Sequence, residues 1–476
     1  MGTVHAKEAV VTDSKDNMNN TTDSEDLGEG TGSPSESRIK HIFHGDIKVK
    51  VERIRIEGLG RTKDDFIVKH VSQLFEAETF KDVIFKSGVV KQELEELDMF
   101  QGVGVLIDTS KGPKARPDGV DVTVIVKESR RLTGNAHTSV GNNEGSLVLG
   151  ARCPNLLGRG ENLSAEYSRG TRHSMGYNVT FTKPLQGDTD KRLTASVFKT
   201  SGDFLCSSYK EIDHGVLLEA MLPSFLGQHN FKWEGSWRDV SCLSRTASFT
   251  VREMSGHSVK SSLKHVFTRD TRNERIYPTQ GYLFQISQEL AGNRLGGDVQ
   301  FLKGEAEIQL NKKLIKDCVI SCSLQAGLMK SLNYTETRIN DRFFLGGATS
   351  VRGFNFRGLG PHADGDAVGG EAYWAAGLHL FTPLPFMPGR GGLGDLFRTH
   401  MFVNAGNLCN LDLEEQNVQQ HLERLRDNFR WSYGAGIVLR LGRIARFELN
   451  YVIPRTALHS DSINAGLQFG VGVSFL

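Results

Sequence analysis

The chain is 476 residues long and nearly neutral, with 57 basic residues, 56 acidic residues and a formal net charge of +1. This length allows two or more structural units and a large buried interior. The balance of charge argues against nucleic acid as the main partner, because neutralising phosphates requires a concentrated basic surface. The 52 glycines beside 12 prolines suit a chain with many tight turns and curved strands.

Hydropathy alone does not reveal a membrane segment. No window holds the roughly eighteen uncharged apolar residues that a spanning helix needs. The nearest candidate, Ala372–Pro388, is interrupted by three prolines and contains His379. Strands of a membrane barrel need only about ten alternating residues each. The absence of such a window therefore argues against a helical membrane protein, but it does not exclude a β-barrel.

Residues 1–42 form a polar, acidic leader. They are rich in Ser, Asn, Thr and Gly and nearly free of large apolar side chains, a composition that predicts disorder. The leader has no apolar signal core, and its acidic residues oppose an Arg-rich transit peptide, so we expect any membrane targeting to be internal. These acidic residues are Glu8, Asp13, Asp16, Asp23, Glu25, Asp26, Glu29 and Glu36.

Residues 45–128 predict a small α+β domain with the order β-α-α-β-β. The first strand alternates until its phase slips at Glu52–Arg53, as a strand with a bulge would. Thr62–Asp65 and Thr79–Asp82 each fit a capping box at the start of a helix. The apolar residues at helical spacing are Ile67, Val71, Leu74 and Phe75, then Val90, Leu94 and Leu97; alternating strands follow at Val103–Ile107 and Val120–Val126.

Residues 130–476 predict a transmembrane β-barrel. Alternation recurs for about 345 residues, which is more than one soluble β core usually spans. Glu305 and Glu307 repeat along one face of a strand, as lumen-facing positions do. The expected fold is mainly β, with sixteen antiparallel strands; the count depends on whether Arg245–Glu253 is a strand or a loop, and only Leu413–Leu425 suggests a helix. Aromatic residues consistent with an interfacial girdle are Trp233, Trp237, Tyr373, Trp374, Trp431 and Tyr433.

Chemistry-bearing motifs are scarce. Cys318 and Cys322 lie in an apparent strand, roughly 13 Å apart, whereas the Cα atoms of a disulfide lie within about 7 Å; a structural role fits them better. Gly389–Gly394 fits G-x-G-x-x-G, but no βαβ unit surrounds it, so nucleotide binding is disfavoured. We find no catalytic motif, and we expect no enzymatic activity, no cofactor and no metal site. The remaining cysteines are Cys153, Cys206, Cys242 and Cys409.

One glycine-rich segment, Arg342–Phe354, stands out. On composition alone, its Val351-Arg352-Gly353-Phe354 fits an ordinary exposed turn as well as a functional loop. The segment nevertheless resembles the signature loop of the BamA-type insertase superfamily. Two further stretches are similar to motifs of the same superfamily: Asp270-Thr271-Arg272 followed by Pro278 and Gly281, and Gly369-Gly370 leading to Thr382–Phe386.

The resemblance covers residues 45–476, and residues 45–128 look like a single POTRA domain. One such domain, no bacterial signal peptide and an acidic leader narrow the resemblance to the family of the fifty-kilodalton subunit of the mitochondrial sorting and assembly machinery. In the superfamily the loop folds back into the barrel, and its Arg pairs with inward carboxylates. An unpaired buried charge would be costly.

This chain departs from the bacterial pattern at the partners of that Arg. Where bacterial strands usually carry Glu and Asp, the chain has His379 and Asn404. We therefore expect Glu371, or another carboxylate in the lumen, to pair with Arg352.

The two ends of the barrel carry the remaining candidate residues. The C-terminus resembles a β-signal, the mark of a barrel's last strand. Its residues in this chain are Gln468, Gly470, Val473 and Phe475. The last strand, about Gly466–Phe475, should meet the first, about Leu132–Asn142, which contains Gly134 and Gly141. Glycines weaken strand pairing, and the resemblance implies a lateral gate at this position.

The resemblance implies an insertase that folds barrel precursors into the mitochondrial outer membrane, with its POTRA domain in the intermembrane space. The implied partners are unfolded β-barrel precursors, metaxin-like subunits, the inner-membrane cristae-organising complex and the lipid bilayer. A passive channel would share the alternation without requiring the Arg352 loop or a POTRA domain. A third alternative, a soluble multi-sheet binding protein, would bury its apolar faces in a dry interior.

Overall fold

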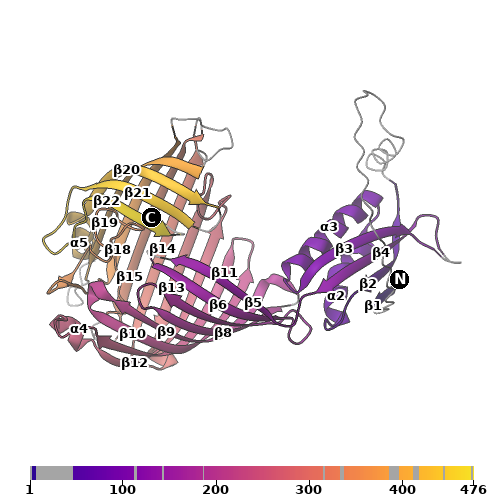
Figure 1. Cartoon of the computed structure of the whole chain (residues 1–476), viewed down its shortest axis with the longest axis horizontal. Helices are drawn as coiled ribbons and strands as arrows, with labels where there is room; N and C mark the ends of the chain where they lie inside the picture. The colour runs from indigo at the N-terminus through magenta and orange to yellow at the C-terminus, as the bar shows by residue number, and fades with distance from the viewer. Residues whose placement is uncertain are drawn as a thin grey trace, which may run out of the picture. The chain divides into compact units, whose positions relative to one another are not determined.

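The computed structural model describes residues 3–6, 47–111, 115–141, 144–185, 187–314, 317–332, 337–384, 396–410, 418–442, 445–472 and 475–476. The chain divides into two compact units, both visible in Figure 1. The small unit comprises residues 1–133 with segments 153–163 and 183–189, and the large unit comprises the rest. Apart from Thr3–Ala6, the leader predicted to be disordered lies outside the described residues.

The small unit is an α+β fold with a four-stranded sheet in the order β1-β2-β4-β3. From β2 onward it has the predicted order β-α-α-β-β. Helical residues such as Ile67 and Val90 share one buried core with strand residues such as Ile54 and Val122, all 0% exposed. Its elements are β1 (Thr3–Ala6), β2 (Lys50–Glu57), α2 (Asp64–Val71), η1 (Ser72–Glu76), α3 (Phe80–Glu96), β3 (Phe100–Thr109) and β4 (Gly119–Glu128).

The second predicted capping box is confirmed at the start of α3. The Thr79 hydroxyl accepts a hydrogen bond from the Asp82 backbone N–H at 3.2 Å, and the Asp82 carboxylate accepts one from the Thr79 N–H at 3.2 Å. Two of the N–H groups that a helix leaves unpaired at its first turn are thereby satisfied.

The first predicted capping box, at Thr62, is wrong. Helix α2 has Lys63 at its N-cap, with no side-chain cap, and the Thr62 hydroxyl donates instead to Glu128 at 2.6 Å. Glu128 also accepts hydrogen bonds from the backbone N–H groups of residues 60–62. Burial alone would raise the pKa of Glu128, but these hydrogen bonds outweigh it and lower the pKa to about 2. The Thr62 hydroxyl, which the local sequence predicted to cap the helix, therefore bonds Glu128, a carboxylate distant in the chain.

The large unit is a sixteen-stranded antiparallel sheet curled into a barrel (Figure 1), as predicted. Sheet order follows the chain from β5 to β22, with β18 beside β15. Its strands are β5 (Thr133–Gly141), β6 (Glu144–Pro154), β7 (Asn162–Gly170), β8 (Met175–Leu185), β9 (Asp188–Phe204), β10 (Tyr209–Pro223), β11 (Gln228–Cys242), β12 (Gly256–Asp270), β13 (Gly281–Ala291), β14 (Phe301–Lys313), β15 (Val319–Ser331), β18 (Ala372–Pro383), β19 (Phe397–Cys409), β20 (Arg430–Leu441), β21 (Ala445–Pro454) and β22 (Gly466–Gly472).

The connections contain short elements. Arg245–Glu253, left open between strand and loop, holds the helix α4 (Phe249–Glu253). The helix suggested at Leu413–Leu425 is α5 (Val418–Asp427), and residues 411–417 lie outside the described residues. The others are η2 (Leu205–Ser207), η3 (Asn293–Leu295), β16 (His362–Ala363) and β17 (Asp366–Ala367).

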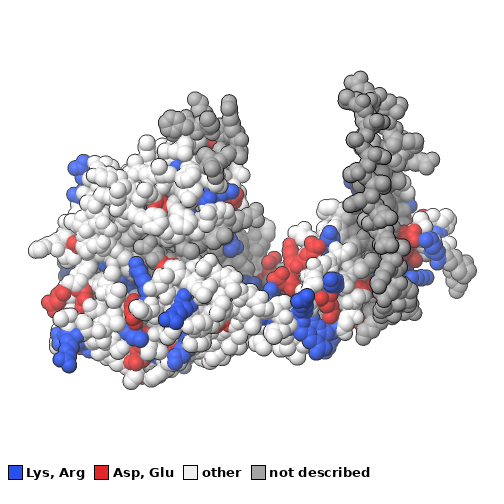
Figure 2. All heavy atoms as spheres, viewed as in Figure 1, with Lys and Arg blue, Asp and Glu red and all other residues white. Residues whose placement is uncertain are grey.

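Polar side chains face the inside of the barrel and apolar side chains face outward. In β21, Leu449 and Tyr451 are 49% and 56% exposed, whereas the intervening Glu448 and Asn450 are 1% and 3% exposed. A soluble sandwich would have the opposite pattern, so this alternation is that of a membrane barrel. In Figure 2 much of the visible barrel wall is free of charge, whereas charged side chains crowd the small unit. No helix among the described residues has the length and apolar character to cross a membrane.

Candidate functional site: the lumen loop and the last strand

The segment 337–371, here called the lumen loop, connects β15 to β18 and packs against the inner face of the barrel. Val351, Arg352 and Phe354 are each 0% exposed. Val351 and Phe354 belong to a buried apolar cluster with strand residues such as Ala375 and Leu408. The tetrapeptide is therefore not an exposed turn.

Arg352 is paired with Glu448 of β21. Its Nε and Nη2 atoms donate to Glu448 Oε2 at 3.1 and 2.9 Å, and its Nη1 donates to Asn404 Oδ1 of β19 at 3.1 Å. The prediction of a lumen carboxylate is thus correct, but the choice of Glu371 is wrong. Glu371 lies just before β18, where its carboxylate accepts a hydrogen bond from Thr337 at 2.8 Å.

Glu448 serves two guanidinium groups. Arg446, two residues earlier on the same face of β21, donates to Glu448 Oε1. Asn450 donates to Oε2 at 2.8 Å, and His400 contacts Asn450 at 3.0 Å. A buried charge is stable only when it is paired and hydrogen-bonded, and this cluster meets both conditions for Glu448. His379 joins the same chain of contacts through His400 at 2.9 Å.

Aromatic rings complete the surroundings of the two guanidiniums. Arg352 lies over Phe402 at 5.0 Å and over Phe475 at 5.7 Å, while Arg446 lies over Phe475 at 4.4 Å and over Phe381 at 4.9 Å. Such cation–π contacts are strongest where water is excluded. The predicted β-signal residue Phe475 therefore stands next to both charges.

The lumen loop is also bonded to the last strand. The Gly353 backbone N–H donates to Gln468 Oε1 at 3.1 Å, and Gln468 Nε2 donates to the Phe354 carbonyl at 3.0 Å. The Leu476 N–H donates to the Thr349 carbonyl at 3.0 Å. The polar residue of the predicted β-signal is thus the side chain that satisfies the loop's backbone.

The other predicted site residues are distributed between both ends of the sheet. Gly470 lies where a Cβ atom would stand 2.9 Å from Ala348 of the lumen loop, so its lack of a side chain allows the loop to approach. Val473 lies outside the described residues. Gly134 and Gly141 lie on β5, at the opposite end of the sheet order.

The glycine of the tetrapeptide is required by its backbone. Gly353 has φ +91°, and a Cβ atom there would stand 3.1 Å from Val452 Cγ1 of β21. Other residues rarely adopt this conformation. Glycine therefore permits both the turn and the close approach to β21.

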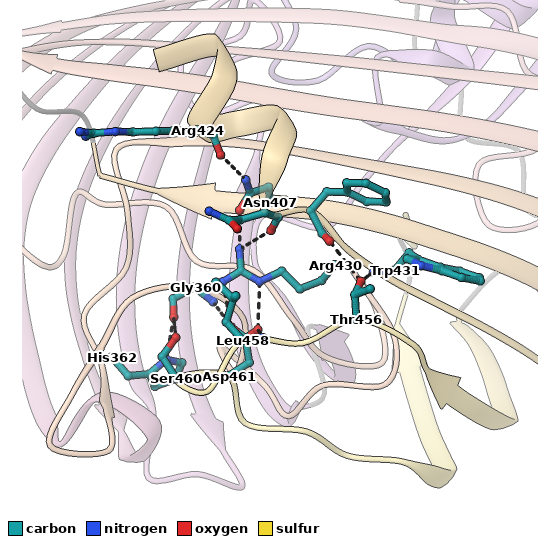
Figure 3. A network of polar contacts seen from close by, with 12 residues as sticks. Gly360, His362, Asn407, Arg424, Arg430, Trp431, Thr456, Leu458, Ser460 and Asp461 are labelled. Atoms are coloured by element: carbon teal, nitrogen blue, oxygen red, sulfur yellow. Dashed lines mark hydrogen bonds and ion pairs between the residues drawn. The ribbon is translucent and has the colours of Figure 1, made fainter. Parts of the chain in front are cut away.

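A second network, absent from our sequence predictions, ties the lumen loop to two other connections (Figure 3). Arg430 of β20 donates to Asp461 at 2.9 and 3.1 Å, and Asp461 also accepts from the Gly360 N–H at 3.1 Å. Arg430 donates in addition to Asn407, whose amide donates to the last carbonyls of α5 at 2.9 Å. Nothing in the local sequence marks Asp461 as a network residue, because Arg430 and Gly360 are 31 and 101 residues away in the chain.

A third buried pair holds the start of the lumen loop. Arg238 of β11 donates twice to Asp341, at 2.8 and 3.0 Å, and both side chains are 4% exposed. Burial would raise the pKa of Asp341, but the Arg238 guanidinium lowers it below its usual value. Lys303 donates to the Asp341 carbonyl at 3.0 Å. The loop is therefore held to the barrel wall from several strands.

The described part of the chain offers no metal centre. Within it, no three His, Cys, Asp or Glu side chains converge as metal ligands would. All six cysteines are free. The site consists of charge pairs and hydrogen bonds that position a loop against a strand.

Comparison with known proteins places this arrangement in a family. The Omp85 superfamily domain matches residues 155–475. The chain is 49% identical to the sorting and assembly machinery component 50 homolog B of Xenopus laevis over the whole of both chains. It is 50% identical to the human homolog over 428 residues, which cover 90% of this chain and 91% of the human one. The chain belongs to the sorting and assembly machinery component 50 family, within the Omp85 superfamily.

A solved structure shares the fold. The crystal structure of BamA from Haemophilus ducreyi lacking POTRA domains 1–3 matches with a TM-score of 0.72. The match covers 89% of this chain and 84% of that one, at 21% sequence identity. This chain and that protein therefore share a fold.

Proposed function

We propose that the protein is an insertase that folds β-barrel precursors into the mitochondrial outer membrane. The observation that carries this proposal is the bonding of the lumen loop to the last strand, where Gln468 accepts from the Gly353 N–H and donates to the Phe354 carbonyl. A passive pore has no need of a connection that binds the terminal strand from inside the barrel. The names of the relatives, components of a sorting and assembly machinery, support the same function.

The boundary between β5 and β22, here called the seam, is the proposed lateral gate. These two strands stand at opposite ends of the sheet order. Among the described residues, β22 has 7 residues, whereas β10 and β11 have 15 each, so fewer described backbone groups join the last strand to its neighbour. An edge strand offers unpaired backbone groups to another chain. A precursor's last strand would pair with β5 at the seam.

The same proposal implies a location for the small unit and a set of partner proteins. The small α+β unit would act as a POTRA domain in the intermembrane space, where it would meet unfolded precursors. Metaxin-like subunits would bind the cytosolic side, and contact with the inner-membrane organising complex would add a role in cristae organisation. The proposed work needs no covalent chemistry, so we assign no catalytic residue.

Depletion of the protein tests the function directly. We expect other outer-membrane barrels to accumulate as unassembled precursors, and normal assembly in depleted membranes would overturn the proposal. Cysteines placed singly along β5 test the gate, since they should cross-link to a precursor's last strand more than cysteines along β10. Equal cross-linking around the barrel would argue against a gate.

The alternative function, a passive channel, is favoured by the polar lumen wall, where Glu305 and Glu307 line β14. The variant Arg352→Ala distinguishes the passive channel from the insertase. An insertase predicts impaired assembly of other barrels with this variant. A passive channel predicts unchanged conductance together with normal assembly.

A further inference from the structure

The outer wall of the barrel has an apolar groove that is separate from the lumen site. The groove crosses the outward faces of β15, β18, β19, β20 and β21 and has a volume of about 760 Å³. Ligand sites typically have volumes of roughly 300–1,000 Å³. The groove is therefore large enough to hold part of a small molecule against the barrel.

The groove exists because a small residue stands between large ones in the inter-strand register. Ala435 of β20 lies opposite Met401 of β19 on one side and Tyr451 of β21 on the other. Met401 and Tyr451 are 55% and 56% exposed, so both side chains point out of the barrel. The next outward positions along β20 are Tyr433 and Ile437, since the side chains of a strand alternate. Four larger side chains therefore frame the hollow over Ala435.

Aromatic side chains and a cation stand at one end of the groove, here called its mouth. Trp431 and Tyr433 line the groove, and their rings stack at 5.9 Å. Arg455 follows the end of β21; it donates to the Tyr433 hydroxyl at 2.7 Å, and its guanidinium lies 5.2 Å from the centre of that ring. Trp and Tyr concentrate at the level of the lipid headgroups, and Arg side chains reach towards the same level.

Hydrogen bonds to the backbone fix the mouth in place. The Arg455 N–H donates to the Trp431 carbonyl at 2.9 Å. The Trp431 N–H donates to the Thr456 hydroxyl oxygen at 3.0 Å, a contact drawn in Figure 3 beside the Arg430 network. Arg430, the residue before Trp431, is 3% exposed and bonded to Asp461. A ligand would therefore meet a mouth that is already ordered, which lowers the cost of binding.

The charge of Arg455 is free to meet an anion. A guanidinium has five N–H donors, and the hydrogen bond to Tyr433 uses one of them. Among the described residues no carboxylate pairs with Arg455, whereas Arg430 pairs with Asp461 at 2.9 Å. Arg matches phosphate oxygens through two parallel N–H bonds. The groove thus combines an apolar hollow with a phosphate-binding group at its mouth.

We propose that this groove is a selective binding site for a phospholipid with a negatively charged headgroup. An acyl chain fills the hollow over Ala435, and the phosphate accepts hydrogen bonds from Arg455. A transmembrane helix of a partner protein would cover the hollow but would bring no phosphate to Arg455, so the lipid is the better occupant. This inference goes beyond the insertase function and does not depend on it.

The first experiment uses Trp431 as the reporter. The full chain contains 4 tryptophans, and Trp233→Phe, Trp237→Phe and Trp374→Phe leave Trp431 alone. This single-tryptophan chain is placed in phosphatidylcholine vesicles that contain a minor fraction of brominated phosphatidylglycerol or brominated phosphatidylcholine, whose bromines quench tryptophan fluorescence. The relative binding constant should favour phosphatidylglycerol about three- to tenfold, because one Arg at the headgroup level attracts an anionic lipid. Equal quenching by the two lipids would overturn the proposal.

Two variants of the single-tryptophan chain separate the acyl chain from the headgroup. Ala435→Leu fills the hollow and Arg455→Gln removes the cation, and each should reduce the preference to about one. Ala220→Leu adds the same volume to the outer wall at β10. Arg269→Gln removes an exposed Arg that also lies over a tyrosine, Tyr282, at 5.7 Å. These two controls should keep the preference. A preference that survives in both groove variants, or that is lost in both controls, would refute this groove as the site.

Native mass spectrometry of the full chain identifies the occupant. Released from micelles of mixed phosphatidylglycerol and phosphatidylcholine, the chain should retain one more phosphatidylglycerol than its Ala435→Leu variant. Inorganic phosphate at constant ionic strength should not displace this lipid, because the acyl chain contributes to its binding. Displacement by phosphate, or a small membrane protein retained in place of the lipid, would overturn the assignment.

Discussion

The charge arrangement around Glu448 predicts an order of effects between two substitutions. Glu448 contacts the guanidiniums of Arg352 and Arg446 at once, with side chains that are buried. Glu448→Gln leaves both positive charges buried without their carboxylate. Arg352→Met leaves the carboxylate paired with Arg446, so one buried cation and one buried carboxylate remain.

The expected magnitudes differ accordingly. Removing one partner of a buried ion pair costs about 3–5 kcal/mol, and Glu448→Gln should reach or exceed this range because it affects two cations. Arg352→Met keeps most of the aliphatic volume and loses hydrogen bonds worth about 0.5–1.5 kcal/mol each. We therefore expect a loss of about 1–3 kcal/mol for Arg352→Met, clearly below that for Glu448→Gln.

Hydrogen exchange measures the docking of the lumen loop. The amide of Gly353, bonded to Gln468, should exchange about a hundred- to a thousandfold faster in Glu448→Gln, since every 1.4 kcal/mol or so is a factor of ten. Glu305→Gln is the control, because Glu305 faces the lumen beside Lys303 at 3.5 Å. Faster exchange in Arg352→Met than in Glu448→Gln would refute the charge-balance reasoning.

Three further predictions concern single residues. Gly353→Ala should destabilise loop docking more than Gly365→Ala does, as measured by protease cleavage of the loop. Both glycines have positive φ, but a Cβ atom at Gly353 would meet β21, whereas one at Gly365 would meet open space. Equal effects would exclude the close contact as the cause. Glu128 has a folded-state pKa of about 2, below its ordinary 4.5, so its stabilisation is present above about pH 4.5 and is lost as the pH falls towards 2. Glu128→Gln should lower the urea midpoint of the small unit at pH 7, with a difference that shrinks towards pH 2; a pH-independent difference would contradict the assignment. Gln468→Leu leaves two buried backbone groups unpaired and should weaken loop docking by about 1–3 kcal/mol, whereas Gln325→Leu, also in the lumen, should leave hydrogen exchange of the loop unchanged.

Periodicity accounts for the elements that could be predicted locally. The alternation along β14 and β21 specified strands, since side chains of a strand point to opposite faces in turn. The helical spacing of Ile67, Val71 and Leu74 specified a buried helix face, and all three are 0% exposed. The capping box at Thr79 formed because both of its partners lie within one turn of the helix.

Long-range competition explains the local predictions that failed. Thr62 had the sequence of a helix cap, but Glu128, 66 residues away, takes its hydroxyl. Glu371, or another carboxylate in the lumen, was the partner predicted for Arg352, and the actual partner Glu448 lies 96 residues from Arg352. The sequence showed that Glu448 alternates with apolar neighbours, but it could not show which carboxylate of the lumen lies next to Arg352.

The sequence by itself determined that this chain forms strands with one polar and one apolar face, because the period of a strand is complete within a short stretch. That Arg352 needs a buried partner followed only from the resemblance of its loop to the superfamily's. Only the tertiary structure decided that Glu448 is that partner, that Gln468 bonds the lumen loop and that Thr3–Ala6 cover β2. Each of these depends on inter-strand register and loop path, which the folding of the whole chain sets.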